Sequence, residues 1–147
     1  MIRILFCCLI ITLGFGSCSQ KKSLNIEGAW KLVQLQTIKG NSAVIDFPGK
    51  SDMDIIKIWS GDHFMSVGRV KTDTTVWDLY GSGTFKQEGN KYEENVKVLF
   101  YKEWEGKTIK MLLEIKNDTL TQTFPVDENG KMEKEYANIE KYVRIKK

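Results

Sequence analysis

The chain has 147 residues, with 22 Lys and Arg against 19 Asp and Glu, and its formal net charge is +3. The basic residues are scattered among acidic ones. This pattern indicates a solvated surface and excludes the one-sided basic face typical of nucleic-acid-binding proteins. Residues 18–147 alone are enough for one domain with a sizeable core.

The first segment of the chain is predicted to be an export signal. Arg3 provides a short positive start, residues 4–16 are apolar and uncharged, and small residues precede Cys18. This layout is typical of a secretory signal that is too short to span a membrane. The stretch Phe15–Cys18 resembles the lipobox of bacterial lipoproteins, although its phenylalanine replaces the usual leucine. The resemblance implies removal of residues 1–17 and lipidation of Cys18; a plain signal peptide or an uncleaved anchor are the alternatives.

The cysteine count supports lipidation. Removal of residues 1–17 would leave Cys18 as the only cysteine, so no internal disulfide could form. Each buried CH₂ of an acyl chain contributes about 0.8 kcal/mol, and two or three chains would hold the protein to a membrane. Residues 18–25 are predicted to be a lipidated tether. Because no acidic run follows the cysteine, we expect an outer membrane lipoprotein that faces the periplasm.

From residue 26 onward, period-2 alternation predicts half-buried strands and no long helix. In residues 91–100, for example, alternate positions from Tyr92 through Glu94 and Val96 to Val98 and Phe100 share one face. Turn clusters at 60–62, 88–90, 117–118 and 127–130 separate the strands. The predicted strands are residues 27–37, 54–60, 63–70, 79–87, 91–100, 107–116, 118–125 and 135–146.

Consecutive hairpins of this kind predict an all-β fold, an antiparallel up-and-down meander of about eight strands that forms a barrel or a sandwich. One long segment, Lys39–Asp52, is predicted to be irregular. Long loops in compact domains are usually functional or disordered. A lid and a surface loop therefore both remain open as interpretations of this segment.

Three stretches in order resemble the lipocalin-like lipoproteins of Gram-negative bacteria. They are Gly28-Ala29-Trp30, which matches the G-x-W that opens lipocalins, then "GSGTFKQEGNKYEENV" and the closing "IEKYVRIK". The resemblance covers most of residues 26–147 and implies a closed, calycin-type barrel. It also implies that Arg144 lies across the ring of Trp30 and closes one end, a structural contact that stabilises by about 0.5–2 kcal/mol.

The sequence lacks the common catalytic and metal-binding motifs, including H-E-x-x-H, C-x-x-C, G-x-S-x-G and a Gly-rich phosphate loop. His63 is the only histidine, which excludes multi-His metal clusters and leaves a surface histidine or, less favoured, a haem ligand. Asp127–Gly130 is more simply a hairpin turn than a calcium loop. We therefore predict no enzyme activity, no catalytic residue, no metal and no cofactor.

Glu94 is in phase with the apolar positions of its strand. A carboxylate that points into a barrel is costly unless it is paired, and Arg69 and Arg144 are the candidate partners. A polar contact in a ligand cavity and a structural or strand-end role are both open interpretations. The residues predicted to contact a ligand are Phe64, Phe85, Tyr92, Glu94, Met111 and Gln122.

The preferred hypothesis is a lipid-anchored, non-enzymatic barrel that binds a small apolar or amphipathic molecule. The alternative is a protein-binding lipoprotein with a filled barrel, such as an inhibitor of an envelope-attacking hydrolase or an assembly factor. Trp77 and Trp104, in or beside turns, are candidate contacts for a protein partner. A lined cavity with an inward Glu94 favours the first hypothesis, whereas a filled core and exposed aromatic residues favour the second.

Overall fold

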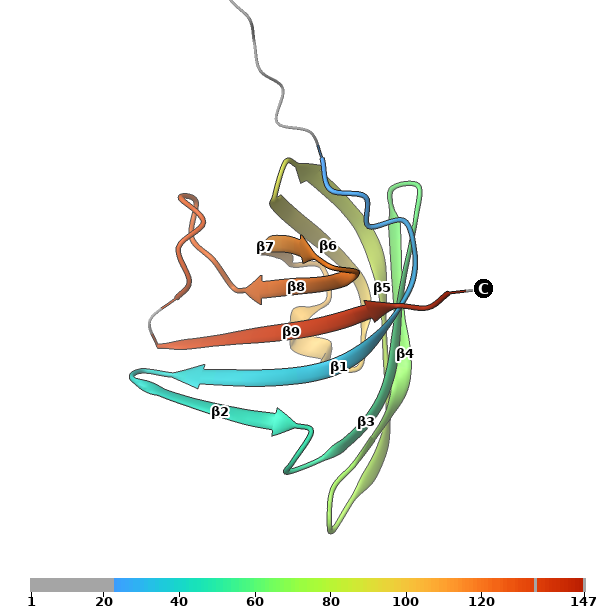
Figure 1. Cartoon of the computed structure of the whole chain (residues 1–147), viewed down its shortest axis with the longest axis vertical. Helices are drawn as coiled ribbons and strands as arrows, with labels where there is room; N and C mark the ends of the chain where they lie inside the picture. The colour runs from blue at the N-terminus through green and yellow to red at the C-terminus, as the bar shows by residue number, and fades with distance from the viewer. Residues whose placement is uncertain (1–22, 134, 147) are drawn as a thin grey trace, which may run out of the picture.

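The computed structural model describes residues 23–133 and 135–146, and the predicted signal segment and Cys18 lie outside these residues (Figure 1). In the described ranges the chain forms one nine-stranded sheet with a single short 3-10 helix. None of the helices in these ranges is long and apolar enough to cross a membrane. The elements are β1 (Gly28–Lys39), β2 (Ser42–Phe47), β3 (Asp52–Ser60), β4 (His63–Lys71), β5 (Val76–Glu88), β6 (Lys91–Leu99), η1 (Lys102–Trp104), β7 (Thr108–Lys116), β8 (Thr119–Phe124) and β9 (Tyr136–Arg144).

Eight of these strands form a closed antiparallel barrel, which confirms the predicted all-β class and is consistent with a lipocalin-like architecture. Each strand from β3 to β8 pairs with the strand that follows it in the sequence. Strand β9 then pairs with β1, from Arg144 opposite Trp30 to Tyr136 opposite Lys39. The first four residues of β1 also pair with β3 and complete the ring. The interior of this ring is where inward-facing side chains from different strands meet.

Strand β2 corrects the prediction that Lys39–Asp52 is irregular. It pairs with the second half of β1 around a turn at Gly40, whose φ of 58° suits glycine. The hairpin lies at the margin of the sheet, beside the outer half of β1 (Figure 1). Because Ala43, Val44 and Ile45 are all exposed, the strand shows no alternation of apolar and polar residues. The period-2 pattern therefore could not reveal it.

A bulge in β6 corrects a second prediction, that Val98 and Phe100 face inward with Glu94. The register between β5 and β6 shifts between Ser82 and Gly83, so that Val96 lies opposite Gly83 but Val98 lies opposite Ser82. An extra residue in one strand moves every later side chain to the other face. Val98 is accordingly 43% exposed on the outer wall.

The two ends of the barrel differ in their connections. At one end, called the closed end, β3–β4, β5–β6 and β7–β8 are joined by the two-residue turns 61–62, 89–90 and 117–118. Each of these turns contains at least one residue with φ between 50° and 61°, a conformation typical of tight hairpin turns. The turns therefore agree with the hairpins predicted from the sequence. The other end, called the loop end, carries the remaining connections, including the two long ones at residues 100–107 and 125–135.

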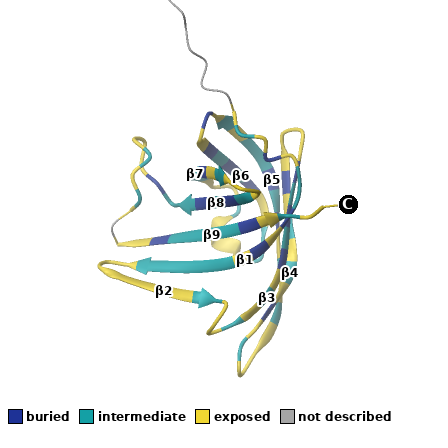
Figure 2. Cartoon of the chain, in the orientation of Figure 1, coloured by how far each residue is buried: buried dark blue, intermediate teal, exposed yellow. Residues whose placement is uncertain are grey.

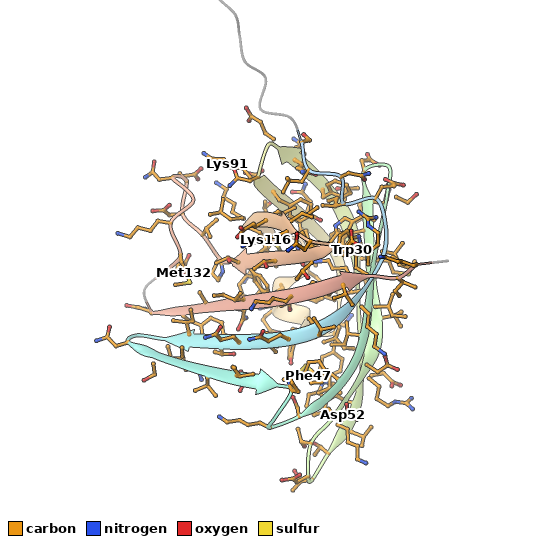
Figure 3. The ribbon with its side chains drawn as sticks, in the orientation of Figure 1. Trp30, Phe47, Asp52, Lys91, Lys116 and Met132 are labelled. Atoms are coloured by element: carbon orange, nitrogen blue, oxygen red, sulfur yellow. The ribbon has the colours of Figure 1, made fainter. Side chains whose placement is uncertain are left out.

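Trp30 seals the closed end. Its side chain is 0% exposed, and its Nε1 donates a hydrogen bond to the carbonyl oxygen of Ile26 at 2.8 Å. The guanidinium of Arg144 lies 4.1 Å from the centre of the Trp30 ring, in the position that the family resemblance implies. Arg144 also donates to the backbone carbonyls of Asn25 and Glu27. The segment that leads into β1 is thereby held across the closed end (Figure 3).

Burial decreases from the closed end to the loop end, although the trend has exceptions such as Val70 (Figure 2). The largest fully buried side chains include Trp30, Trp59, Tyr92 and Leu120, all of which lie in the half of their strands nearer the closed end. Near the loop end, apolar side chains that pack against this core are only half-buried. These residues are Phe47, Met53, Trp77, Leu79, Leu99, Ile109 and Phe124.

Candidate functional site

A buried ion pair lies inside the barrel. Lys57 of β3, Glu94 of β6 and Gln122 of β8 are 6%, 4% and 0% exposed. The ammonium nitrogen of Lys57 is 2.5 Å from Glu94 Oε1 and donates a hydrogen bond to Gln122 Oε1 at 3.2 Å. None of the three strands is adjacent to another in the sheet, so the contacts cross the barrel interior. Burial of these groups is tolerated because each has a partner of opposite charge or a hydrogen bond.

Aromatic residues extend this network toward the closed end. Trp59 Nε1 donates to the hydroxyl of Tyr92 at 2.6 Å, and this hydroxyl donates to Glu94 Oε1 at 2.9 Å. Burial, followed by the nearby Glu94 charge, raises the pKa of Tyr92, so the phenol remains a neutral donor. The ammonium of Lys57 also lies 5.1 Å and 5.2 Å from the ring centres of Trp59 and Phe64. These contacts hold the ion pair in a defined position.

A second carboxylate, Glu140 of β9, faces the same interior. Its Oε2 accepts a hydrogen bond from the Tyr142 hydroxyl at 2.6 Å, and the Tyr142 ring packs edge-on against Trp59. Burial raises the pKa of Glu140, while the charge of Lys57 opposes this effect and that of Glu94 adds to it. Among the described residues, no Lys, Arg or His nitrogen lies within 4.0 Å of Glu140. The interior therefore has one lysine for two carboxylates.

The structure brings together the six residues predicted to contact a ligand. Phe64, Tyr92, Glu94, Met111 and Gln122 are buried, and each contacts another member of the set or Lys57. Gln122 Nε2 lies 3.4 Å from the sulfur of Met111. The half-buried ring of Phe85 lies 5.2 Å from that of Tyr92.

The predicted partners of Glu94 were wrong. Arg69 lies on the outer wall, with its Nε 2.7 Å from Asp78 Oδ1. This hydrogen bond and ion pair raise the pKa of Arg69 and lower that of Asp78. Arg144 covers Trp30 instead. The actual partner, Lys57, could have been found, because it is in phase with the inward Ile55 and Trp59 of its strand.

Sequence reasoning also missed Glu140 and Tyr142. The signal was available, since the two residues are two positions apart on β9 and so share a face. Gln122 is the cross-strand neighbour of Glu140, and Leu120 is that of Tyr142.

The remaining candidates lie apart from this network. His63 is an exposed residue whose Nδ1 is 2.5 Å from Asp62 Oδ1. Trp104 is exposed in η1, with the Lys107 ammonium 5.2 Å from its ring centre. Trp77 is half-buried on β5, and its buried Nε1 has no hydrogen-bond partner among the described residues. It is thus an unused donor in the apolar wall near the loop end.

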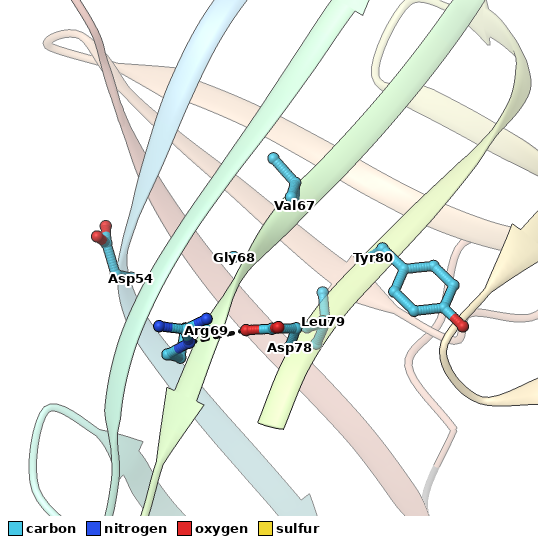
Figure 4. A pocket seen from close by; sticks show the side chains of 7 residues that line it. All are labelled: Asp54, Val67, Gly68, Arg69, Asp78, Leu79 and Tyr80. Carbon is cyan, nitrogen blue, oxygen red and sulfur yellow. Dashed lines mark hydrogen bonds and ion pairs between the residues drawn. The ribbon is translucent and has the colours of Figure 1, made fainter. Parts of the chain in front are cut away.

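A depression of about 400 Å³ lies on strands β3 to β5, where the outward-facing Arg69 and Asp78 pair with each other (Figure 4). The Arg69–Asp78 pair forms part of its floor. The lining residues are Asp54, Val67, Gly68, Arg69, Asp78, Leu79 and Tyr80. None of the residues of the polar interior lines this depression.

We expect Glu140→Gln to stabilise the protein at neutral pH. Because the folded-state pKa of Glu140 is raised, the folded state binds a proton more tightly than the unfolded state, and ionisation of Glu140 lowers stability as the pH rises. Below about pH 4 the carboxyl is protonated in both states, and this cost disappears. Thermal unfolding should show a higher Tm for the variant at pH 7.5 and a smaller difference at pH 4.

The matched control is Glu114→Gln, which alters an exposed glutamate on the outer face of β7. Its Tm should follow that of the parent at both pH values. A Glu140→Gln variant that is less stable than the parent at pH 7.5 would contradict this prediction, because it would mean that the ionised carboxylate is stabilising.

The sequence matches no protein-family model, and no curated protein is similar to it.

Proposed function

We propose that this chain is a lipid-anchored envelope protein whose barrel binds a small amphipathic molecule and catalyses no reaction. The observation that carries the proposal is the arrangement of the interior. A polar cluster of Lys57, Glu94, Gln122 and Glu140 lies at the level where the buried core gives way to half-buried apolar side chains. Apolar walls with a few polar groups are typical of small-molecule sites.

The anchoring part of the proposal comes from the sequence around Cys18. A chain attached through this residue would approach the barrel at its closed end, because Gln87 and Arg144 bind the backbone of residues 24–27 there. The loop end, with its half-buried apolar side chains, would then point away from the membrane. A ligand could reach it from the periplasm.

Native mass spectrometry of the full chain, purified from its own envelope in mild detergent, tests the binding function. We expect one small molecule per chain, released when the barrel is unfolded. The same sample reports the anchor, since lipidation adds the mass of two or three acyl chains to a chain that begins at Cys18. An empty barrel at native expression would contradict the binding proposal, and an unmodified Cys18 would contradict the anchor independently.

One observation favours the protein-binding alternative. An outer aromatic patch on β4 to β6 and the following loop contains several exposed apolar residues, and three of its rings are in contact. Tyr80 packs edge-on against Phe100, which packs against Tyr101. The patch consists of Met65, Val67, Tyr80, Val98, Phe100 and Tyr101. Exposed apolar clusters of this kind mark interaction surfaces.

A photo-crosslinking residue at position 80, compared with one at Thr84 on the same outward face of β5, tests this alternative. A protein crosslinked in the cell only from position 80, together with an empty barrel, would support the alternative over the carrier. Equal crosslinking from both positions would count against a specific protein site.

A further inference from the structure

The polar interior has an excess of negative charge. Lys57 is committed to Glu94 at 2.5 Å and to Gln122 at 3.2 Å, so its charge is already neutralised. Glu140 has one hydrogen-bond donor, the Tyr142 hydroxyl, and no cation within 4.0 Å among the described residues. A partly buried carboxylate without a counter-charge is unfavourable. Among the residues that the structure describes, the interior therefore has one positive charge for two carboxylates.

Glu140 also lies at the boundary between the filled and the half-buried parts of the barrel. Its cross-strand neighbours are Leu35 on β1 and Gln122 on β8. The next inward layer toward the closed end contains Tyr142 with Leu32 and is buried. The layer on the opposite side, toward the loop end, contains half-buried residues, among them Phe124 of β8. Glu140 is itself half-buried, so it is the carboxylate of the pair that a molecule entering from the loop end would reach.

We propose that the ligand of this barrel carries a cationic, amine-type head group that pairs with Glu140, while its apolar part lies among the half-buried side chains of the loop end. This inference rests on the proposed binding function and specifies its ligand. An ammonium group would form a charge-assisted hydrogen bond with the free Glu140 oxygen and restore charge balance in the interior. An anionic head group would instead meet an unpaired carboxylate and a lysine that is already neutralised by Glu94.

Isothermal titration calorimetry of the full chain with octylammonium, octanol and octanoate tests the inference, because the three probes share one apolar chain. At pH 7.5 we expect octylammonium to bind about tenfold more tightly than octanol, and octanoate to bind most weakly. Glu140→Gln should remove the preference for the ammonium and leave octanol binding unchanged. Glu114→Gln, on the outer face of β7, should retain the preference and controls for partition into detergent.

A pH series on the parent chain provides a second readout. The groups that face Glu140 are Lys57 of β3, Tyr92 and Glu94 of β6, and Tyr142 of its own strand. Octylammonium affinity should fall as acidification protonates Glu140, whereas octanol affinity should stay constant. Equal binding of all three probes, or a preference that persists in Glu140→Gln, would overturn the inference but not the binding function. Binding of none of them would count against both.

Discussion

Replacing Lys57 with methionine should lower the free energy of unfolding by about 3–5 kcal/mol, because it leaves Glu94 buried without its counter-charge. The ammonium is 2.5 Å from Glu94 Oε1, and both side chains are almost completely removed from solvent. Methionine has a similar length and no charge, so the lower free energy of unfolding would reflect the broken ion pair and not a new cavity. Denaturant unfolding followed by tryptophan fluorescence measures it.

Two further variants distinguish the contribution of the ion pair to stability from the effect of losing any lysine. In Lys57→Met combined with Glu94→Gln, neither member of the pair carries a charge and the Tyr92 hydroxyl keeps an acceptor, so most of the lost stability should return. The double-mutant cycle should give an interaction energy of about 1–3 kcal/mol.

Lys31→Met, which breaks an exposed pair with Asp54, should change stability by less than about 1 kcal/mol. A Lys57→Met variant as stable as the parent would show that the pair is not closed in solution.

Replacing Trp30 with alanine should lower the free energy of unfolding by about 3–5 kcal/mol. The side chain is completely buried at the closed end, and its removal would leave a cavity beneath Arg144 and free the carbonyl of Ile26. The barrel would also lose the contact that holds the incoming chain across its closed end. Equilibrium unfolding in guanidinium chloride measures this loss.

Trp104→Ala provides the control for the loss of a tryptophan. Trp104 is 37% exposed in η1, and the Lys107 ammonium lies 5.2 Å from its ring centre, so the change in stability should stay within about 0.5 kcal/mol. A Trp30→Ala loss as small as that of Trp104→Ala would mean that the closed end is not sealed by this residue. The closure implied by the family resemblance would then be wrong for this chain.

The strands were predictable wherever one face is buried and the other is solvated. Residues Ile109, Met111 and Leu113 occupy alternate positions, with the polar Lys110 and Glu114 on the other face, and β7 begins and ends close to the predicted positions. The turns at Gly61, Gly89 and Asn117 were predictable because their conformation requires glycine or asparagine. Strand β2 was not, since Ala43, Val44 and Ile45 are exposed at consecutive positions and give no alternation.

The candidate site was only half predictable. The inward position of Glu94 follows from its phase with Tyr92 and Val96, and the structure places all three inside the barrel. Alternation also places Lys57 on the inward face of its strand, but it does not show which inward side chains meet across a closed barrel.

By itself, the sequence determined the all-β class, most strand boundaries, the closed-end turns and which face of most strands carries apolar residues, because all of these depend on local alternation and local backbone conformation. Only the tertiary structure decided that Lys57 pairs with Glu94, that Val98 faces outward, and that no cation of the described residues lies beside Glu140. These features depend on which strands face each other across a closed barrel and on one extra residue in β6. Contacts between strands that are not neighbours in the sheet leave no periodic signal in the chain.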